Sequence, residues 1–114
     1  MGGTNYIGGI IKILEKPKLE NLTNNVFVTK FRAQFPQRRN PRMVTVTVWG
    51  NLARDVTTYS QKNDYLLIEG YLSVRNITPL SLPPSKSKRI EITVFKFYPF
   101  HPVRLTSENS VPQT

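Results

Sequence analysis

The chain has 114 residues, 39% of them hydrophobic and 20% charged, which fits one globular domain and leaves no room for two. It has no cysteine and a single histidine, His101, which excludes a disulfide framework and a thiolate metal site. Sixteen Lys and Arg against seven Asp and Glu give a net charge of +9, as expected of a nucleic-acid-binding domain, a basic subunit of a larger assembly or a merely solvated surface.

The first predicted strand covers residues 6–14. The N-terminal segment lacks a basic n-region, and its apolar run is broken by glycines and a lysine. We therefore expect this segment to be the first strand of the mature domain rather than a targeting peptide. Gly8 and Gly9 predict a bend or bulge in this strand. The strand stops near Pro17, and the Asn-rich residues 21–25 predict a turn. No run reaches the roughly 20 apolar residues of a membrane span.

The second and third strands are predicted from period-two alternation. Residues 26–35 place Thr29, Phe31, Ala33 and Phe35 on one face and Lys30, Arg32 and Gln34 on the other. Pro36 ends this strand, and residues 37–42 form a basic loop. Residues 43–49 place Val44, Val46 and Val48 on one face and Met43, Thr45, Thr47 and Trp49 on the other. Adjacent pairing of these strands would bring Lys30 and Arg32 beside Thr45 and Thr47.

A single helix is predicted over residues 51–60, after Gly50. Asn51 is the expected N-cap. Leu52, Val56 and Tyr59 fall at i, i+4 and i+7 and form the expected apolar stripe.

The remaining elements are two strands at residues 65–75 and 88–98, joined by a Pro- and Ser-rich loop. Tyr71, Ser73 and Arg75 share one face of the former, as does Glu69, which we expect to be paired or in a subunit contact because a carboxylate there would oppose phosphate. His101 is interpreted as a turn residue. Residues 101–114 are expected to form a short flexible tail.

The element order is therefore β-β-β-α-β-β, which is that of the oligosaccharide/oligonucleotide-binding (OB) barrel. We predict an all-β, five-stranded OB domain over residues 1–100, with one helix between its third and fourth strands. The binding face of such barrels uses the central strands and the loops after strands 1 and 4. A five-stranded barrel without that activity is the alternative.

Residues 46–75 (VTVWGNLARDVTTYSQKNDYLLIEGYLSVR) resemble bacterial single-stranded-DNA-binding proteins. Those proteins have a strand ending in aromatic-glycine, a Lys/Asn-Leu-Ala helix and a strand with an Ile-Glu-Gly core, matched here by residues 49–50, 51–53 and 68–70. Residues 17–20 (PKLE) sit at the family's Asp-Pro-Glu-Leu-like turn, with Lys16 in place of the leading acid. The similarity covers roughly residues 4–98.

The motifs FRAQFP, VTVWGNLA and IEGYLS look closer still to a short family of such proteins encoded in red-algal plastids and cyanobacteria. This resemblance implies an OB fold, a homo-oligomer paired through sheet edges, and single-stranded DNA wrapped over the outer strands. It also implies the plastid (chloroplast) stroma or the cyanobacterial cytoplasm as the compartment.

Single-strand binding without sequence preference needs cations that follow phosphates and flat side chains on which bases stack. The candidate nucleic-acid-binding residues are Trp49, Tyr71, Arg75, Lys30, Arg32, Arg38, Arg39, Arg42, Thr45, Thr47, Lys86, Lys88 and Arg89. Trp49 and Tyr71 are the stacking candidates. For each of these aromatics, packing in a subunit interface is an alternative. Trp49 could also pack on the helix, and Tyr71 could pair with a side chain of a neighbouring strand. For each cation the alternative is solvated surface.

Bacterial relatives carry more stacking aromatics where this chain has Arg38, Arg39, Met43 and Ile77. Fewer stacking platforms predict weaker, more salt-sensitive binding, or an accessory subunit that uses the barrel for protein contact. The chain also ends in SVPQT instead of an acidic tip, so a recruiting role in replication is not expected. No nucleophile–base pair, cofactor motif or metal cluster is visible, and we predict a non-enzyme. The expected partner is single-stranded DNA, with RNA as the alternative, in a dimer or tetramer.

Overall fold

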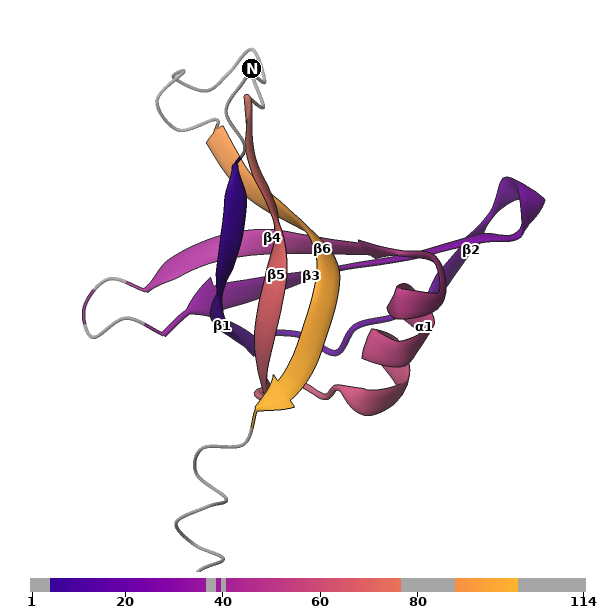
Figure 1. The fold of residues 1–114 in the computed structure, drawn as a ribbon, viewed down its shortest axis with the longest axis horizontal. Coiled ribbons are helices and arrows are strands. Elements are labelled where there is room, and N and C mark those ends of the chain that lie inside the picture. Colours follow the sequence, from indigo (N-terminus) through magenta and orange to yellow (C-terminus); the bar gives the residue numbers. More distant parts are fainter. Residues whose placement is uncertain (1–4, 37–38, 40, 77–87, 101–114) are drawn as a thin grey trace, which may run out of the picture.

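The computed structural model describes residues 5–36, 39, 41–76 and 88–100. Its elements are β1 (Tyr6–Ile13), β2 (Glu20–Leu22), the 3-10 turn η1 (Thr23–Asn25), β3 (Val26–Phe35), β4 (Arg42–Trp49), α1 (Gly50–Tyr59), β5 (Tyr65–Asn76) and β6 (Lys88–Phe100) (Figure 1). No helix in the described ranges is long and apolar enough to cross a membrane. The loop 77–87 and the tail 101–114 lie outside the described residues, and so does His101.

The strands form one sheet in the order β1-β5-β6-β4-β3-β2. Strands β4 and β6 are parallel, and all other pairs are antiparallel. The sheet closes through β1 and β3, where Lys12 pairs with Gln34 and Ile13 with Ala33. In Figure 1, β3 and β4 cross β1, β5 and β6 steeply. The OB fold is confirmed as a partly open barrel, with six strands rather than the predicted five.

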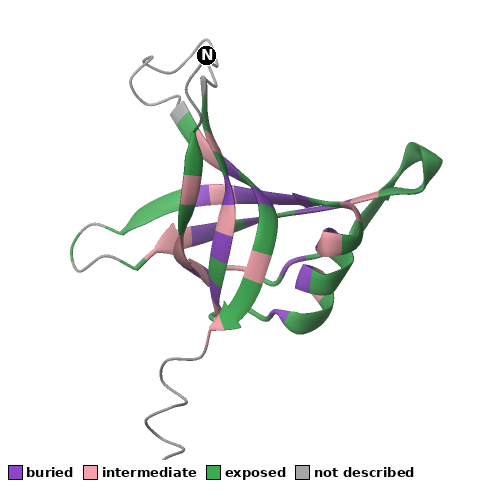
Figure 2. Cartoon of the chain, in the orientation of Figure 1, coloured by how far each residue is buried: buried purple, intermediate pink, exposed green. Residues whose placement is uncertain are grey.

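The core lies between these crossing layers, where buried side chains alternate with more exposed ones along β3, β4 and β5 (Figure 2). The hydrophobic core cluster takes from the strands Ile11, Ile13, Phe31, Ala33, Val44, Val46, Val48, Leu66, Ile68, Ile92 and Val94. Helix α1 contacts β3, β4 and β6 and covers one end of the barrel. The predicted alternation of β3 and β4 is confirmed.

The helix differs from its prediction at both ends. It begins at Gly50 with Trp49 in the N-cap position, and no side chain caps it, so the expectation for Asn51 was wrong. Its buried residues are Ala53 and Val56, followed by Ser60 just after its end. These positions are i, i+3 and i+7, a stripe turned by one residue from the predicted one, and Tyr59 is exposed.

The extra strand β2 forms a hairpin with β3, and its tip extends away from the barrel (Figure 1). Asn24 and Asn25 at this tip have φ of 69° and 60°, which fits the predicted turn, although Asn21 and Leu22 belong to β2. The predicted irregularity at Gly8 and Gly9 is absent, because the β1–β5 register runs unbroken from Tyr6 to Lys12. The bulge lies instead between β5 and β6, at Glu69–Gly70.

Candidate nucleic-acid interface

The outer side of β3 and β4 brings five of the predicted site residues onto one surface. Directly paired residues of an antiparallel ladder point to the same side, and the register pairs Lys30 with Thr47 and Arg32 with Thr45. Trp49 follows two residues after Thr47 and therefore points to the same side. We call Lys30, Arg32, Thr45, Thr47 and Trp49 the β3–β4 face.

Trp49 is held outside the barrel by the turn that leads into α1. It is the last residue of β4, and the chain then passes through Gly50 at φ 69°, a conformation that favours glycine. A Cβ on Gly50 would meet nothing within 4 Å, so this glycine serves backbone geometry rather than packing. Trp49 is 47% exposed, as the alternation predicts.

The other members of the β3–β4 face differ in their exposure to solvent and in their contacts with other side chains. Lys30 is exposed, whereas Thr47 is only 6% exposed, between Lys30 on β3 and Thr93 on β6. Arg32 is engaged by Glu15, whose Oε1 lies 3.5 Å from the arginine Nε and whose Oε2 accepts the backbone N–H of Arg32 at 2.9 Å. The free cation at the centre of the face is therefore Lys30.

The face continues over β6 and β5 into a cluster of aromatic rings. Thr47 pairs with Thr93, and Thr93 pairs with Tyr71. The ring of Phe95 lies 5.1 Å from that of Tyr71 and 6.2 Å from that of Tyr6, between centroids. All three rings are between 40% and 55% exposed. We call Tyr6, Tyr71 and Phe95 the aromatic patch.

Glu69 lies beside this patch and is paired, as predicted. The hydroxyl of Tyr6 donates a hydrogen bond to Oε1 of Glu69 at 3.0 Å. That hydrogen bond, with a smaller effect of reduced contact with water and of the Glu69 charge, raises the pKa of Tyr6 above its ordinary value of 10.0. The carboxylate is thereby directed at a tyrosine rather than at the β3–β4 face.

The other predicted cations are not all brought to this surface. Arg39 is exposed in the segment between β3 and β4. Arg42 shares strand parity with the buried valines and lines a separate hollow of about 440 Å³ with Ile7, Phe35, Val44, Leu72 and Ile90. Arg89 lies 3.8 Å from Glu91, between Nη1 and Oε2.

Arg38 and Lys86 lie outside the described residues, and only the backbone positions of Arg75 and Lys88 are described. No group of three or more His, Cys, Asp or Glu that could hold a metal ion occurs in the described part of the chain.

Comparison with known proteins shows to which family this chain belongs. The chain is 37% identical over 100 residues to the "Putative single-stranded DNA-binding protein ycf41" of Trieres chinensis, covering 84% of this chain and 88% of that protein. The chain belongs to the ycf41 family. The protein of the same name from Porphyra purpurea is 20% identical over 91 residues, which are 80% of this chain and 82% of that protein. No protein-family model matches.

Solved structures show the same fold for this ycf41-family chain. The SSB domain of a Synechococcus sp. protein superposes with a TM-score of 0.67 at 23% identity, covering 86% of this chain and 98% of that one. The second single-stranded DNA-binding protein of Mycobacterium smegmatis gives a TM-score of 0.67 at 24% identity, with 85% and 89% coverage. The predicted resemblance is confirmed. The two ycf41 proteins are named as single-stranded DNA-binding proteins, in agreement with the prediction of a non-enzyme.

Two features of this ycf41-family chain were missed from the sequence. Tyr6 and Phe95 were not predicted as surface aromatics, although Tyr6 shares strand parity with Gly8 and opposes Tyr71; outward parity on β1 was the available signal. Lys16, which replaces an acid in the similar bacterial proteins, donates hydrogen bonds from Nζ to the carbonyl oxygens of Thr57 (3.0 Å) and Ser60 (2.8 Å). It binds the end of α1.

Proposed function

We propose that this ycf41-family protein binds single-stranded DNA on the β3–β4 face, without catalysis and with little sequence preference. The observation that carries the proposal is the exposed indole of Trp49, which shares one side of a two-stranded ladder with Lys30 and Arg32. Bases stack on aromatic faces whatever their sequence, and cations follow the phosphates between them. The two requirements of non-specific single-strand binding therefore meet on one surface.

The aromatic patch extends this surface with a second stacking platform at Tyr71. Thr93 lies between its two paired residues, Thr47 and Tyr71. A flexible DNA strand can therefore cross from β4 to β5 over small side chains. Stacking is favourable for RNA as well as DNA bases, and RNA remains the alternative ligand. Arg39 and Arg89, with Arg38, Arg75, Lys86 and Lys88, are proposed as flanking phosphate contacts.

We further propose a homo-oligomer that pairs through the edge of β1. In the described part of the sheet, β1 pairs with β5 along one side, and with β3 only at Lys12 and Ile13 on the other. The backbone of residues 6–11 therefore presents a second edge, and such edges are templates for pairing with another chain. A dimer or a tetramer built on that edge would leave the β3–β4 face open.

A second candidate function is supported by the aromatic patch itself. Three exposed rings beside a hydrogen-bonded carboxylate are also suited to a protein interface, which is enriched in tyrosine and phenylalanine. In that case the chain would be an accessory subunit of a larger plastid or cyanobacterial complex. We propose the plastid stroma or the cyanobacterial cytoplasm as its compartment in either case.

The experiment is a titration of labelled oligo-dT of several lengths, followed by fluorescence anisotropy at low and high salt. Trp49→Ala is expected to weaken binding by about 1–3 kcal/mol without lowering the melting temperature. The matched control is Tyr59→Ala, which removes an exposed aromatic from α1 and should leave affinity unchanged. Absence of binding by the wild type at low salt would overturn the proposal in favour of the accessory subunit.

A further inference from the structure

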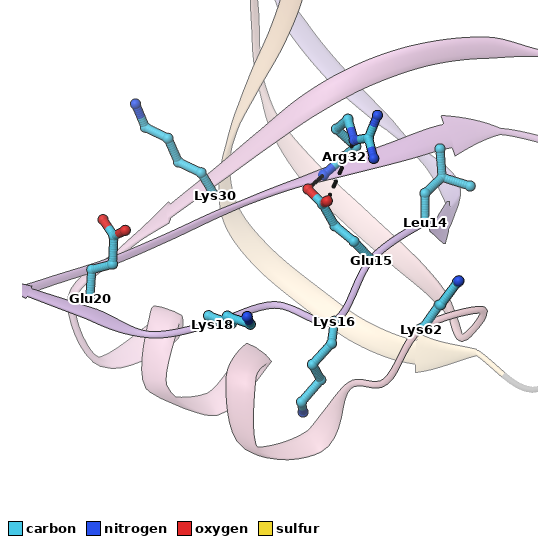
Figure 3. A pocket seen from close by; sticks show the side chains of 8 residues that line it. All are labelled: Leu14, Glu15, Lys16, Lys18, Glu20, Lys30, Arg32 and Lys62. Carbon is cyan, nitrogen blue, oxygen red and sulfur yellow. Dashed lines mark hydrogen bonds and ion pairs between the residues drawn. The ribbon is translucent and has the colours of Figure 1, made fainter.

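A basic groove of about 580 Å³ lies between β3 and the segment that joins β1 to β2 (Figure 3). It is lined by Leu14, Glu15, Lys16, Lys18, Glu20, Lys30, Arg32 and Lys62. Lys30 and Arg32 also belong to the β3–β4 face. A DNA strand bound to the β3–β4 face can therefore continue into the groove and stay in contact with cationic side chains.

The groove carries five cationic side chains against two carboxylates. Lys16 points toward α1 in Figure 3 and is bound to the carbonyl oxygens of Thr57 and Ser60. Lys18, Lys30 and Lys62 are exposed and come from three separate segments. A concave surface lined by cations of this kind concentrates a polyanion.

Glu15 engages two donors of Arg32 in this groove. One of its oxygens accepts the backbone N–H of Arg32 at 2.9 Å, and the other lies 3.5 Å from the guanidinium Nε. A phosphate that offers two oxygens to a guanidinium and a neighbouring N–H needs the same pair of donors. The carboxylate of Glu15 therefore stands where a phosphate would bind.

The ion pair between Arg32 and Glu15 is weak enough for a phosphate to replace the carboxylate. The side chains of Arg32 and Glu15 are 59% and 43% exposed, and an ion pair this open to water contributes little to stability. We propose that the basic groove takes the phosphodiester backbone of the bound strand, and that Glu15 acts as a built-in competitor that the strand displaces from Arg32. The inference rests on the proposed function and adds a path and a regulatory contact to it.

The test compares Glu15→Gln with Asp55→Asn in the oligo-dT titration. Glutamine keeps a carbonyl oxygen for the Arg32 N–H and removes the competing charge. Asp55→Asn makes the same charge change at an exposed residue of α1 that does not line the groove. We expect Glu15→Gln to bind about threefold to fivefold more tightly at low salt. The salt dependence should steepen by about 0.7 in log–log slope, the amount of one phosphate contact.

Two further measurements keep the test decisive. Adding Arg32→Gln should remove the gain seen in Glu15→Gln, because the freed guanidinium is its source. In the otherwise unchanged chain, Lys18→Gln and Lys62→Gln should each reduce the slope by about 0.7, which tests the groove even if Glu15→Gln folds poorly.

Equal affinity and slope in Glu15→Gln and Asp55→Asn, with binding that still depends on Trp49, would overturn the competitor role and leave the proposed function intact. Unchanged slopes in both lysine variants would overturn the groove as the path. No binding by the wild type would overturn both proposals.

Discussion

Tyr71 and Phe95 lie with ring centroids 5.1 Å apart and ring planes at 41°, on neighbouring strands whose register shifts between them. Gly70 pairs with Val94 and Glu69 with Lys96, so Phe95 is the additional residue of the bulge. A bulge of this kind redirects a side chain out of the regular alternation. It brings the ring of Phe95 to 5.1 Å from that of Tyr71 and 6.2 Å from that of Tyr6.

Tyr71→Ala is expected to weaken oligo-dT binding by about 1 kcal/mol or more, because it removes a stacking platform. The measurement is an anisotropy titration, with sedimentation velocity of the same variant as its control. Weaker binding with an unchanged oligomer assigns Tyr71 to the DNA surface. A smaller oligomer with unchanged affinity per chain would assign it to a subunit interface instead.

Gly70→Ala is expected to destabilise the fold by about 3 kcal/mol. An added Cβ would overlap the carbonyl oxygen of Thr93 and come within 3.0 Å of the Cα of Val94, and both are backbone atoms that cannot turn aside. Gly9→Ala is the matched control, since its Cβ would meet only the Phe35 ring at 3.9 Å. Chemical denaturation measures both. Equal stability of the two variants would show that the bulge is pliable.

Lys16→Met is expected to destabilise the protein by about 1–2 kcal/mol, because it removes charge-assisted hydrogen bonds to the carbonyl oxygens of Thr57 in α1 and of Ser60 just after it. Methionine keeps most of the aliphatic stem, so packing is preserved. Lys18→Met, two residues along the same segment and exposed, serves as control and should leave the melting temperature unchanged. A loss shared by both variants would indicate a general charge effect.

Tyr6 should remain protonated above pH 10, since the hydrogen bond to Glu69 raises its pKa. For a group whose folded pKa is raised, the stabilisation is complete below the unfolded value of 10 and is lost as pH rises through the folded one. Ultraviolet titration of the chain's five tyrosines measures this, with Tyr6→Phe identifying the late component. In Glu69→Ala, which leaves no acceptor for the Tyr6 hydroxyl, the pKa of Tyr6 should move down toward 10. A wild-type Tyr6 that already titrates at 10 would refute the contact.

Much of the fold follows from local pattern. The alternating valines of β4 and the run from Thr29 to Phe35 in β3 fix which side is buried, and this places Trp49 outside. The bulge at Phe95 could not be predicted, because it depends on the register between β5 and β6. Local propensity does not encode that register.

The helix stripe was displaced for a similar reason. Val56 belongs to both stripes, and contact with β3, β4 and β6 selects Ala53 and Ser60 beside it rather than Leu52 and Tyr59. The contact between Glu15 and Arg32 also has no local signal. It arises because the chain beyond β1 continues beside β3, where the N–H of Leu14 donates to the carbonyl oxygen of Arg32 at 2.9 Å.

The most direct measurement of the central claim uses the intrinsic fluorescence of Trp49, the only tryptophan in the chain. Oligo-dT should quench this emission in a saturable manner at low salt, and added salt should reverse the quenching as counterions replace the strand. Unchanged emission while a labelled oligonucleotide binds in parallel would mean that DNA lies on another surface. Unchanged emission without any binding would mean that the β3–β4 face does not bind nucleic acid.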